Sequence, residues 1–333
     1  MGRRTLLICF NRLLGDWLCR QAAESLNSEN VTAGSYFRLL RELILQSSAA
    51  SEFMEHERQS QTEDLFDEVY ANHGRTAVQE INKPYDVLVM DEGQDLLRAS
   101  VLSVLDCWLR KGLADGRWAI FGDFERQALF GTSDAMQLRG ALKQVAPDYA
   151  RGRLSLNCRN TRSIGEETAL LSGFESPPYR LAQVMGSPVD YRYYNSPESE
   201  RKLIAETLLR LLSNGVRASD IVVLSRLRLE NSAVGQLDGG KEFRILDVLD
   251  RVSKDSATPV IRFATVHAFK GMESPVVVLC DIERVGESEP QSLLYVAMSR
   301  ARSQLIVLAH ENASRTIGEC VRRKLHGWGV EHE

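Results

Sequence analysis

The chain has 333 residues, of which 44% are hydrophobic and 26% charged, and its formal net charge is −4 at pH 7. This composition is typical of a folded globular protein and excludes a collagen-like or wholly disordered chain. No apolar run reaches the roughly 20 residues that a membrane-spanning helix needs, so we expect no membrane partner. The mild negative charge excludes a uniformly basic nucleic-acid coat but is compatible with a local basic groove. The length predicts about two domains.

The six cysteines include no CxxC pair, and three of them, Cys9, Cys107 and Cys280, lie in apolar or helix-like stretches. This pattern predicts buried thiols in a reducing compartment, and it favours neither disulfides nor a metal site. Because the sequence shows no recognisable export or membrane segment, the predicted location is cytoplasmic.

Short apolar runs alternate with amphipathic stretches along the whole chain, which predicts an α/β fold with parallel sheets. The elements expected in the first half are strands over 5–10, 87–90 and 118–121, a helix from residue 13 and a crossover helix over 96–109. The polar segment 47–80 is compatible with surface helices or with a mobile connection.

In the second half, the expected strands cover 153–156, 189–194, 221–225, 275–280 and 303–309. The clearest helix has Ser196 as its N-cap and Pro197 in its first turn, and it ends at Gly215. Residues 228–258 are polar and predict a loop or a small excursion. The economical interpretation is two α/β domains, 1–150 and 151–333.

Acidic residues follow one of the expected strands directly. In open α/β sheets, ligands bind beyond the carboxyl ends of the strands, where the sequence Asp91-Glu92-Gly93-Gln94-Asp95 is expected to lie. Two adjacent carboxylates at such a position suit Mg²⁺ and a nucleophilic water. The alternative is that Asp91 only caps the next helix. After the following strand come Gly122-Asp123, then Gln127, whose amide could sense a phosphate, and Phe130, either a stacking face or a core residue.

Taken together with other segments, these residues resemble the motifs of UvrD/Rep-type superfamily 1 DNA helicases. The segments, each with the motif that it resembles, are LICFNR at 7–12 and VT at 31–32 (the elements after the P-loop helix), DEGQD at 91–95 (Walker B, DExQD), GDFERQ at 122–127 (GDxxQ), LNCRN at 156–160 (LxxNYRS), TVHAFKGME at 265–273 (TxHxxKGLE) and LYVAMSRAR at 294–302 (LYVAxTRAR). Their order along the chain is that of the family.

The resemblance implies two RecA-like domains of the P-loop NTPase type, with ATP bound between them and single-stranded DNA across both. The implied activity is that of an ATP-dependent translocase or helicase that uses ATP and Mg²⁺, and RNA is an alternative to DNA. The implied ATP-site roles are Mg²⁺ binding for Asp91, positioning of the attacking water for Glu92, γ-phosphate sensing for Gln127, ribose contact for Glu273, and arginine fingers for Arg159 and Arg300.

On the DNA side, the resemblance implies contacts from Phe10, Asn11, Phe130, Thr265 and His267. Aromatic stacking on bases is insensitive to sequence, which suits a translocase. Some of the matched residues also have a purely structural interpretation: His267 as a core histidine, and Arg302 and Lys270 as members of structural ion pairs.

The sequence also departs from the family pattern. It contains no GxxxxGK[ST] motif, and its one Gly-Lys pair, Gly240-Lys241, is followed by Glu242 in a polar loop. We therefore expect a first RecA-like domain that is incomplete at its N-terminus, without its P-loop strand and helix, and that binds ATP poorly. Gln127 also lies one residue farther from Asp123 than the GDxxQ spacing.

Two explanations of the missing motif are open: the chain is a fragment or mis-started product of a longer helicase, or another polypeptide supplies the P-loop segment. The leading functional hypothesis is an ATP-dependent single-strand DNA translocase or helicase. The alternative is a non-catalytic nucleic-acid-binding or scaffold protein derived from a helicase. A nuclease is disfavoured because no further cluster of carboxylates with a lysine is recognisable.

Overall fold

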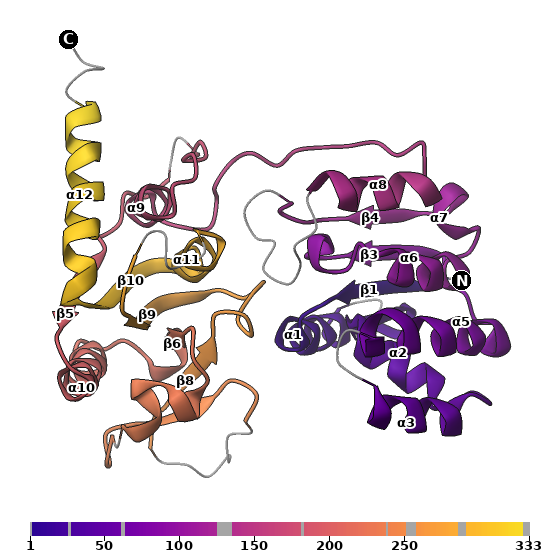
Figure 1. Cartoon of the computed structure of the whole chain (residues 1–333), viewed down its shortest axis with the longest axis horizontal. Coiled ribbons are helices and arrows are strands. Elements are labelled where there is room, and N and C mark those ends of the chain that lie inside the picture. The colour runs from indigo at the N-terminus through magenta and orange to yellow at the C-terminus, as the bar shows by residue number, and fades with distance from the viewer. Residues whose placement is uncertain are drawn as a thin grey trace. The chain divides into compact units, whose positions relative to one another are not determined.

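The fold is described from a computed structural model, for residues 2–25, 28–60, 64–124, 135–180, 183–237, 239–250, 258–285 and 291–328. The chain divides into two compact units, Met1–Gly152 and Arg153–Glu333. Each unit is built on a sheet whose described strands all pair in parallel (Figure 1). The α/β fold with two parallel sheets is therefore confirmed, and it is the architecture expected of RecA-like domains.

The first unit holds a four-stranded sheet with the order β2-β1-β3-β4. Its strands are β1 (Thr5–Cys9), β2 (Val31–Ser35), β3 (Val87–Met90) and β4 (Trp118–Ile120). The helical elements around it are α1 (Arg12–Ala23), η1 (Ser28–Asn30), α2 (Tyr36–Ile44), α3 (Ala50–Gln59), η2 (Leu65–Val69), α5 (Tyr70–Ile81), η3 (Gly93–Asp95), α6 (Ala99–Trp108), α7 (Gly112–Asp115) and α8 (Ala135–Val145).

Alternation of side chains along β1 determines which face of this sheet is covered. Leu6 and Ile8 are buried in the same hydrophobic core as Tyr36 and Leu40 of α2, as the two-residue period of a strand requires. The described part of the polar segment between residues 47 and 80 is mainly helical, with α3, η2 and α5, which favours the surface helices over the mobile connection. Phe53 anchors α3 in this core, with no part of its side chain exposed.

The second unit holds a six-stranded sheet with the order β5-β10-β9-β6-β8-β7. Its strands are β5 (Asp190–Tyr194), β6 (Ile221–Ser225), β7 (Arg244–Asp247), β8 (Val260–Thr265), β9 (Ser274–Ile282) and β10 (Ala301–His310). Its helical elements are α9 (Arg162–Ser172), α10 (Pro197–Ser213), η4 (Ala218–Asp220), η5 (Leu229–Asn231), η6 (Ala233–Gln236), α11 (Gln291–Met298) and α12 (Glu311–Trp328).

The connections of the second sheet run in both directions across it. The chain passes from the edge strand β5 through α10 to β6, and later returns from β9 through α11 to β10. Because parallel crossovers are right-handed, opposite directions place the helices on opposite faces. Figure 1 shows α11 on one side of the sheet and α10 on the other. Ser196 caps α10 through its side chain, as its position before Pro197 predicts.

Two sequence-based expectations for the second unit are wrong. Residues 153–156 form no strand: Leu154 and Leu156 are 91% and 55% exposed, so their apolar alternation meets no neighbouring sheet. The described residues of the segment 228–258 include the strand β7, which the expectation of a loop or a small excursion did not contain. The polar and glycine-rich flanks of this short strand conceal it in the sequence, and only its pairing with β8 defines it.

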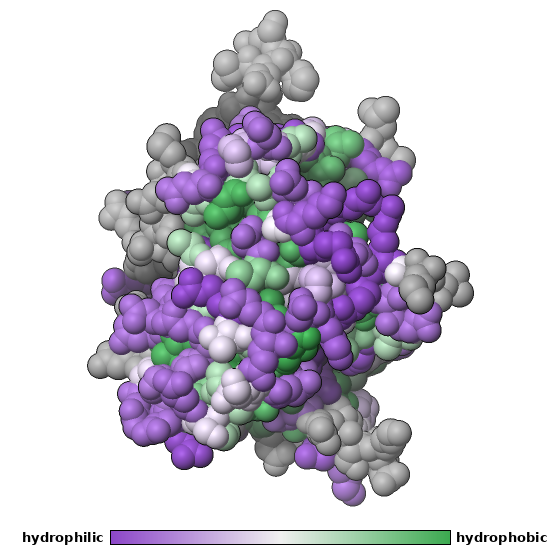
Figure 2. Space-filling model, turned by 90° about the vertical axis from the view of Figure 1, so that its right-hand side faces the viewer, coloured by the Kyte–Doolittle hydropathy of each residue, from purple (hydrophilic) through white to green (hydrophobic). Residues whose placement is uncertain are grey.

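The surface and the cysteines fit an ordinary folded chain. On the face drawn in Figure 2, hydrophilic side chains predominate and hydrophobic ones occur in small areas between them. Among the described helices, none combines the length and apolar character needed to cross a bilayer. None of the six cysteines forms a disulfide. Cys9 and Cys280 are buried as predicted, whereas Cys107 is only partly buried. Burial raises the pKa of the Cys9 and Cys280 thiols, which keeps them protonated.

A buried acidic pair lies at the end of β9. Asp281 has a φ of 58° and accepts hydrogen bonds from the Ser232 hydroxyl at 2.6 Å and the Ala233 amide at 3.1 Å. Its own amide donates to a carboxylate oxygen of Glu200 in α10 at 2.7 Å. Glu200 is only 5% exposed. Burial raises its pKa to about 7, and this effect outweighs the hydrogen bond from the Asp281 amide, which lowers the pKa.

This raised pKa predicts a pH-dependent stability. The folded state binds the Glu200 proton more tightly than the unfolded chain, so this contribution to the free energy of unfolding is present below the ordinary value of 4.5 and is lost as pH rises to about 7. We expect a decrease on the order of 3 kcal/mol at most over that range. Urea unfolding measured at several pH values should show it, and Glu200→Gln should flatten the profile. Glu198→Gln, an exposed neighbour on α10, is the control; an unchanged profile in Glu200→Gln would contradict the assignment.

Candidate functional site

The acidic cluster of the first unit lies where β3 ends. The Asp91 amide donates to the Ile8 carbonyl of β1 at 2.8 Å, so the parallel pairing continues one residue beyond β3. The next amide, of Glu92, donates to Oδ1 of Asp91 at 2.9 Å. Glu92 has a φ of 52°, a left-handed conformation that costs a non-glycine residue roughly 1–2 kcal/mol. Strain of this kind often accompanies functional sites, where the surrounding structure maintains it.

Gln94 joins this cluster to the end of β4. Its side-chain nitrogen donates to a carboxylate oxygen of Glu92 at 2.6 Å, and its side-chain oxygen accepts from the Asp123 amide at 3.1 Å. Gln94 is 5% exposed, so both bonds are shielded from water. The side-chain amide has one donor end and one acceptor end. An ionised carboxylate in its place could only accept and would lack the donor. Sequence reasoning assigned this residue no separate role, although its place in the DExQD-like motif was the available signal.

The two strand ends approach each other so closely that only glycine fits at two positions. A Cβ at Gly93 would lie 2.4 Å from Cγ2 of Ile120, and one at Gly122 would lie 2.4 Å from the side-chain oxygen of Gln94. The Gly93 amide also donates to the Phe121 carbonyl at 2.8 Å. The carboxylates of the cluster are therefore held on a rigid, closely packed turn.

The donor set at this edge suits a hard cation. Mg²⁺ prefers carboxylate oxygens and is usually held by one or two of them together with water and substrate phosphates. Asp91 and Glu92 supply two such groups, and the nearby Asp95 and Asp123 are also acidic. The residues present therefore fit the ion that the resemblance implies.

Phe10 and Asn11 lie at the same edge of the sheet, after β1. The Asn11 side chain caps α1 by accepting from the amides of Leu13 and Leu14, at 2.8 and 3.2 Å. The ring of Phe10 packs edge-on against Phe37, with centroids 6.0 Å apart. Both residues thus have structural partners, and their predicted DNA contacts stay predictions. Gln127 and Phe130 lie outside the described residues.

In the second unit, three separated motifs converge on one charged cluster. Arg159 donates from Nε to a carboxylate oxygen of Glu273 at 2.8 Å, and Nε of Arg302 lies 3.4 Å from the other oxygen of the same carboxylate. All three side chains are partly exposed, between 37% and 55%. The structural ion pair expected for Arg302 is confirmed. Glu273 precedes β9 and Arg302 lies near the start of β10, so this cluster is at the amino ends of those strands.

Two asparagine side chains, one of them buried, hold the Arg159 loop in place. Asn160 is 4% exposed and donates from Nδ2 to the carbonyls of Ser299 and Ala301, at 2.9 and 2.6 Å. Asn157 accepts from the amides of Arg159 and Asn160, at 3.0 and 3.2 Å. The loop is therefore fixed to the start of β10 by hydrogen bonds that span more than a hundred residues of sequence.

Arg300 lies beside this cluster with its side chain fully buried. Its guanidinium donates to the carbonyls of Val296 and Met272, at 3.0 and 3.2 Å, and to the Ser299 hydroxyl at 3.0 Å. Lys270 is also completely buried. In the described conformation, Arg300 thus connects α11 to the segment before β9, and its predicted role as an arginine finger stays a prediction.

Thr265 and His267 occupy the opposite edge of the sheet, after the carboxyl end of β8. The Thr265 hydroxyl accepts from the Ala268 amide at 3.1 Å and so stabilises the turn that follows. Burial, together with the charge of Lys270, lowers the pKa of His267. The imidazole is therefore neutral near pH 7, and it can reach a phosphate only as a hydrogen-bonding group.

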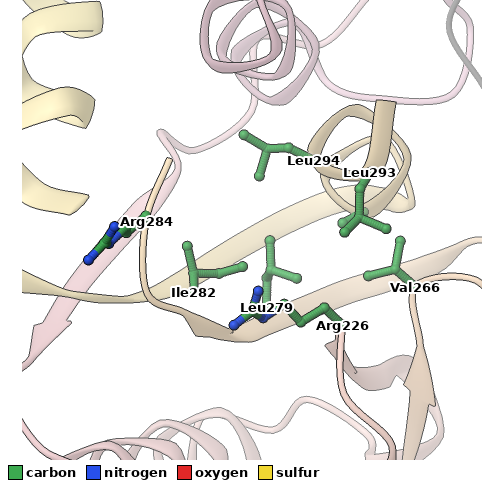
Figure 3. A pocket seen from close by; sticks show the side chains of 8 residues that line it. Arg226, Val266, Leu279, Ile282, Arg284, Leu293 and Leu294 are labelled. Carbon is green, nitrogen blue, oxygen red and sulfur yellow. The ribbon is translucent and has the colours of Figure 1, made fainter. Parts of the chain in front are cut away.

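A small hollow lies at the same carboxyl edge. Figure 3 shows Leu293 and Leu294 of α11 on one side and Leu279 of β9 with Val266 on the other, while the guanidinium of Arg284 points away from them. This mostly apolar lining offers few groups for a nucleotide or a cation. The charged clusters are therefore the stronger candidates for the chemistry.

The close contact at Gly93 gives a prediction about the rigidity of the acidic cluster. Gly93→Ala should destabilise the first unit by roughly 1–3 kcal/mol, because the new methyl group overlaps Ile120 and forces backbone movement. Gly140→Ala in α8 is the matched control, since no atom lies within 4 Å of its Cβ position, and it should stabilise by about 0.4–1 kcal/mol. Urea unfolding of both variants measures the difference. Equal stability of the two variants would show that the turn is not close-packed.

Comparison with known proteins supports a helicase relationship for one segment. Residues 261–308 match the family model of the UvrD-like helicase C-terminal domain. Among solved structures, the C-terminal domain of a possible DNA helicase from Lactobacillus plantarum WCFS1 is 18% identical, with 48% of this chain and 91% of that chain covered and a TM-score of 0.37. No curated protein matches the sequence significantly. The matched segment contains the TxHxxKGLE-like and LYVAxTRAR-like motifs, so this part of the chain is similar to the UvrD-like helicase C-terminal domain.

Proposed function

We propose that this chain is the motor part of an ATP-dependent, single-strand nucleic-acid translocase of the UvrD type. The observation that carries the proposal is the cluster of Arg159, Glu273 and Arg302, with the buried Arg300 beside it. These residues come from three separated segments, and the family-model match covers two of them. A scaffold without chemistry would not need two arginines and a carboxylate at one place.

In the first unit, we assign the phosphate chemistry to the end of β3. Asp91 would bind Mg²⁺, and Glu92, oriented by Gln94, would position the attacking water. When bound, Mg²⁺ neutralises charge on the transferring phosphate. The left-handed backbone at Glu92 and its short bond from Gln94 support this assignment, because they limit the orientations of the carboxylate. Gln127 is proposed for γ-phosphate contact on its motif alone.

In the second unit, Arg159 is the better placed arginine finger. Its guanidinium is 37% exposed and is held by a carboxylate, so an incoming phosphate could replace Glu273 as its partner. That exchange would release Glu273 toward the ribose. Arg300 would need a local rearrangement around Met272 and Ser299 to reach a phosphate. An arginine finger supplies about 10³–10⁵ in rate.

A short connection in the second unit supports coupling between ATP hydrolysis and nucleic-acid binding. Thr265 and His267, proposed for nucleic-acid contact, lie at the carboxyl edge of the sheet, whereas Glu273 lies at the amino edge. The eight residues 266–273 join these two edges and carry the buried Lys270. A change at the nucleotide side would therefore be transmitted through a few packed residues. Phe10, Asn11 and Phe130 are proposed as further contacts to single-stranded DNA or RNA.

The chain by itself should bind nucleotides weakly, because its 333 residues contain no GxxxxGK[ST] motif. A phosphate cradle supplies several charge-assisted hydrogen bonds worth about 1.5–3 kcal/mol each. Millimolar to micromolar binding amounts to only roughly −4 to −8 kcal/mol. Without the cradle most of that free energy is absent, so we propose that a P-loop segment from elsewhere in a longer protein or from a second polypeptide completes the site.

The absence of GxxxxGK[ST] also favours a second candidate function, which is a non-catalytic nucleic-acid-binding or scaffold protein derived from a helicase. The two functions differ in what restored ATP binding would do. The motor proposal requires that a supplied P-loop segment restores ATP hydrolysis, whereas the scaffold retains nucleic-acid binding without hydrolysis in either case.

We predict that the chain alone hydrolyses ATP far more slowly than about 1 s⁻¹ with single-stranded DNA present. A segment that carries GxxxxGK[ST], fused upstream or added in trans, should restore DNA-stimulated hydrolysis, and Glu92→Gln should abolish it again. Phosphate release with and without oligo(dT) measures the rates. Turnover near 1 s⁻¹ in the chain alone would contradict the weak-binding prediction. DNA binding without restored hydrolysis would favour the scaffold.

In the restored enzyme, Arg159→Ala should lower the turnover number by at least about 10³-fold and leave DNA binding unchanged. Arg217→Ala is the control, because its ion pair with Asp220 is in the same unit but outside the cluster. Steady-state hydrolysis and fluorescence anisotropy of a labelled oligonucleotide separate the two effects. A loss of turnover in the control as large as in Arg159→Ala would contradict the assignment of Arg159 as an arginine finger.

A further inference from the structure

A cluster of metal-ligating side chains lies in the first unit, on α3 and α5, and has no part in the proposed function. It consists of Glu52 and His56 of α3 and His73 of α5. Nδ1 of His56 and Nε2 of His73 are 3.0 Å apart, and one ligand atom from each residue lies within 4.8 Å of the others. We propose that these three residues bind a first-row divalent cation of the Zn²⁺ class.

The local structure explains why the three side chains meet. Glu52 and His56 are four residues apart on α3, which places them on the same face of the helix. Phe53 between them is completely buried and packs edge-on against the His73 ring, with centroids 5.7 Å apart. The same helix is held at Glu57, which accepts two bonds from Arg41 at 2.8 and 2.9 Å. The hydroxyl of Tyr70 in α5 also donates to the Glu57 carboxylate at 3.2 Å, so a contact outside the cluster holds α3 against α5.

The distances suit a tetrahedral ion with small movements. With metal–ligand distances of about 2.0–2.2 Å, neighbouring ligand atoms of a tetrahedral site are about 3.3–3.5 Å apart. The two histidine nitrogens need to separate by only a few tenths of an ångström from 3.0 Å. The side chain of Glu52 is exposed and flexible. Rotation about its single bonds can therefore bring the carboxylate within coordination distance of an ion held by the two histidines.

The chemistry of the ligands also favours binding. Two imidazoles and one carboxylate form a ligand set that binds zinc and leaves a fourth position for water. His73 is 8% exposed, so the packing around its ring limits the directions in which the imidazole can point. Exposure increases from His73 through His56 to Glu52, so the ion would enter from the Glu52 side. Such an ion would link α3 to α5 and stabilise the helical layer of the first unit.

Zinc titration of the full chain tests the proposal. After treatment with a chelator and dialysis, isothermal titration with Zn²⁺ should show one site per chain. His56→Gln and Glu52→Gln, both at positions that tolerate polar side chains, should each weaken Zn²⁺ binding by about 100-fold or more. Glu55→Gln is the matched control, since it lies on the same helix outside the cluster and its side chain only accepts from Gln59. His73→Ala is the third variant, with circular dichroism as a check on folding.

Co²⁺ substitution gives a readout that a purely structural histidine pair would not produce. Visible ligand-field absorption typical of a four-coordinate nitrogen and oxygen site should appear in the wild type and in Glu55→Gln, and should be lost in His56→Gln. Zn²⁺ should also raise the melting temperature of the wild type but not of His56→Gln. No Zn²⁺ binding by the wild type, or equal binding by the wild type, His56→Gln and Glu52→Gln, would overturn the proposal. Because no DNA or ATP is present, these outcomes are independent of the motor function.

Discussion

Parallel pairing of the strands is the constraint on which both charged clusters depend. All described strands of a sheet run in the same direction, so the turns after them meet at one edge and the turns before them at the other. In the first unit, this brings the acidic end of β3 beside the end of β4, where Gln94 bridges them. In the second unit, it brings Glu273 beside Arg302, since Ser274 of β9 is in register with Ala301 of β10.

Buried polar side chains then hold these clusters in one arrangement. Gln94, Asn160 and Arg300 are nearly or fully buried, and each bonds to groups far from it in sequence or to the backbone of another element. A buried polar group without such partners costs free energy, so these bonds favour one geometry over its alternatives. The carboxylate of Glu92 is consequently held by the neutral amide of Gln94, and the backbone of Arg159 is held by the side chain of Asn157.

The helical layer of the first unit adds a different kind of order. Aromatic rings of Phe53 and Tyr70 pack edge-on at 5.2 Å, and Arg41 pairs with Glu57 beside them. These contacts turn a segment of polar composition into firmly placed helices. The pair of His56 and His73 is a by-product of that packing, since the two rings approach only because α3 and α5 are anchored by their neighbours.

The sequence by itself determined the α/β class, the strands β3, β6 and β9, the cap of α10 and the motif order, because apolar runs and cap residues act locally. It predicted that carboxylates would follow β3, since a strand end can be identified from its own residues. Only the tertiary structure decided that Leu154 and Leu156 are exposed, that Arg300 is buried, that Gln94 bridges two strands and that His56 meets His73. These facts depend on which neighbours are present in space, and the neighbours come from positions that no local pattern connects.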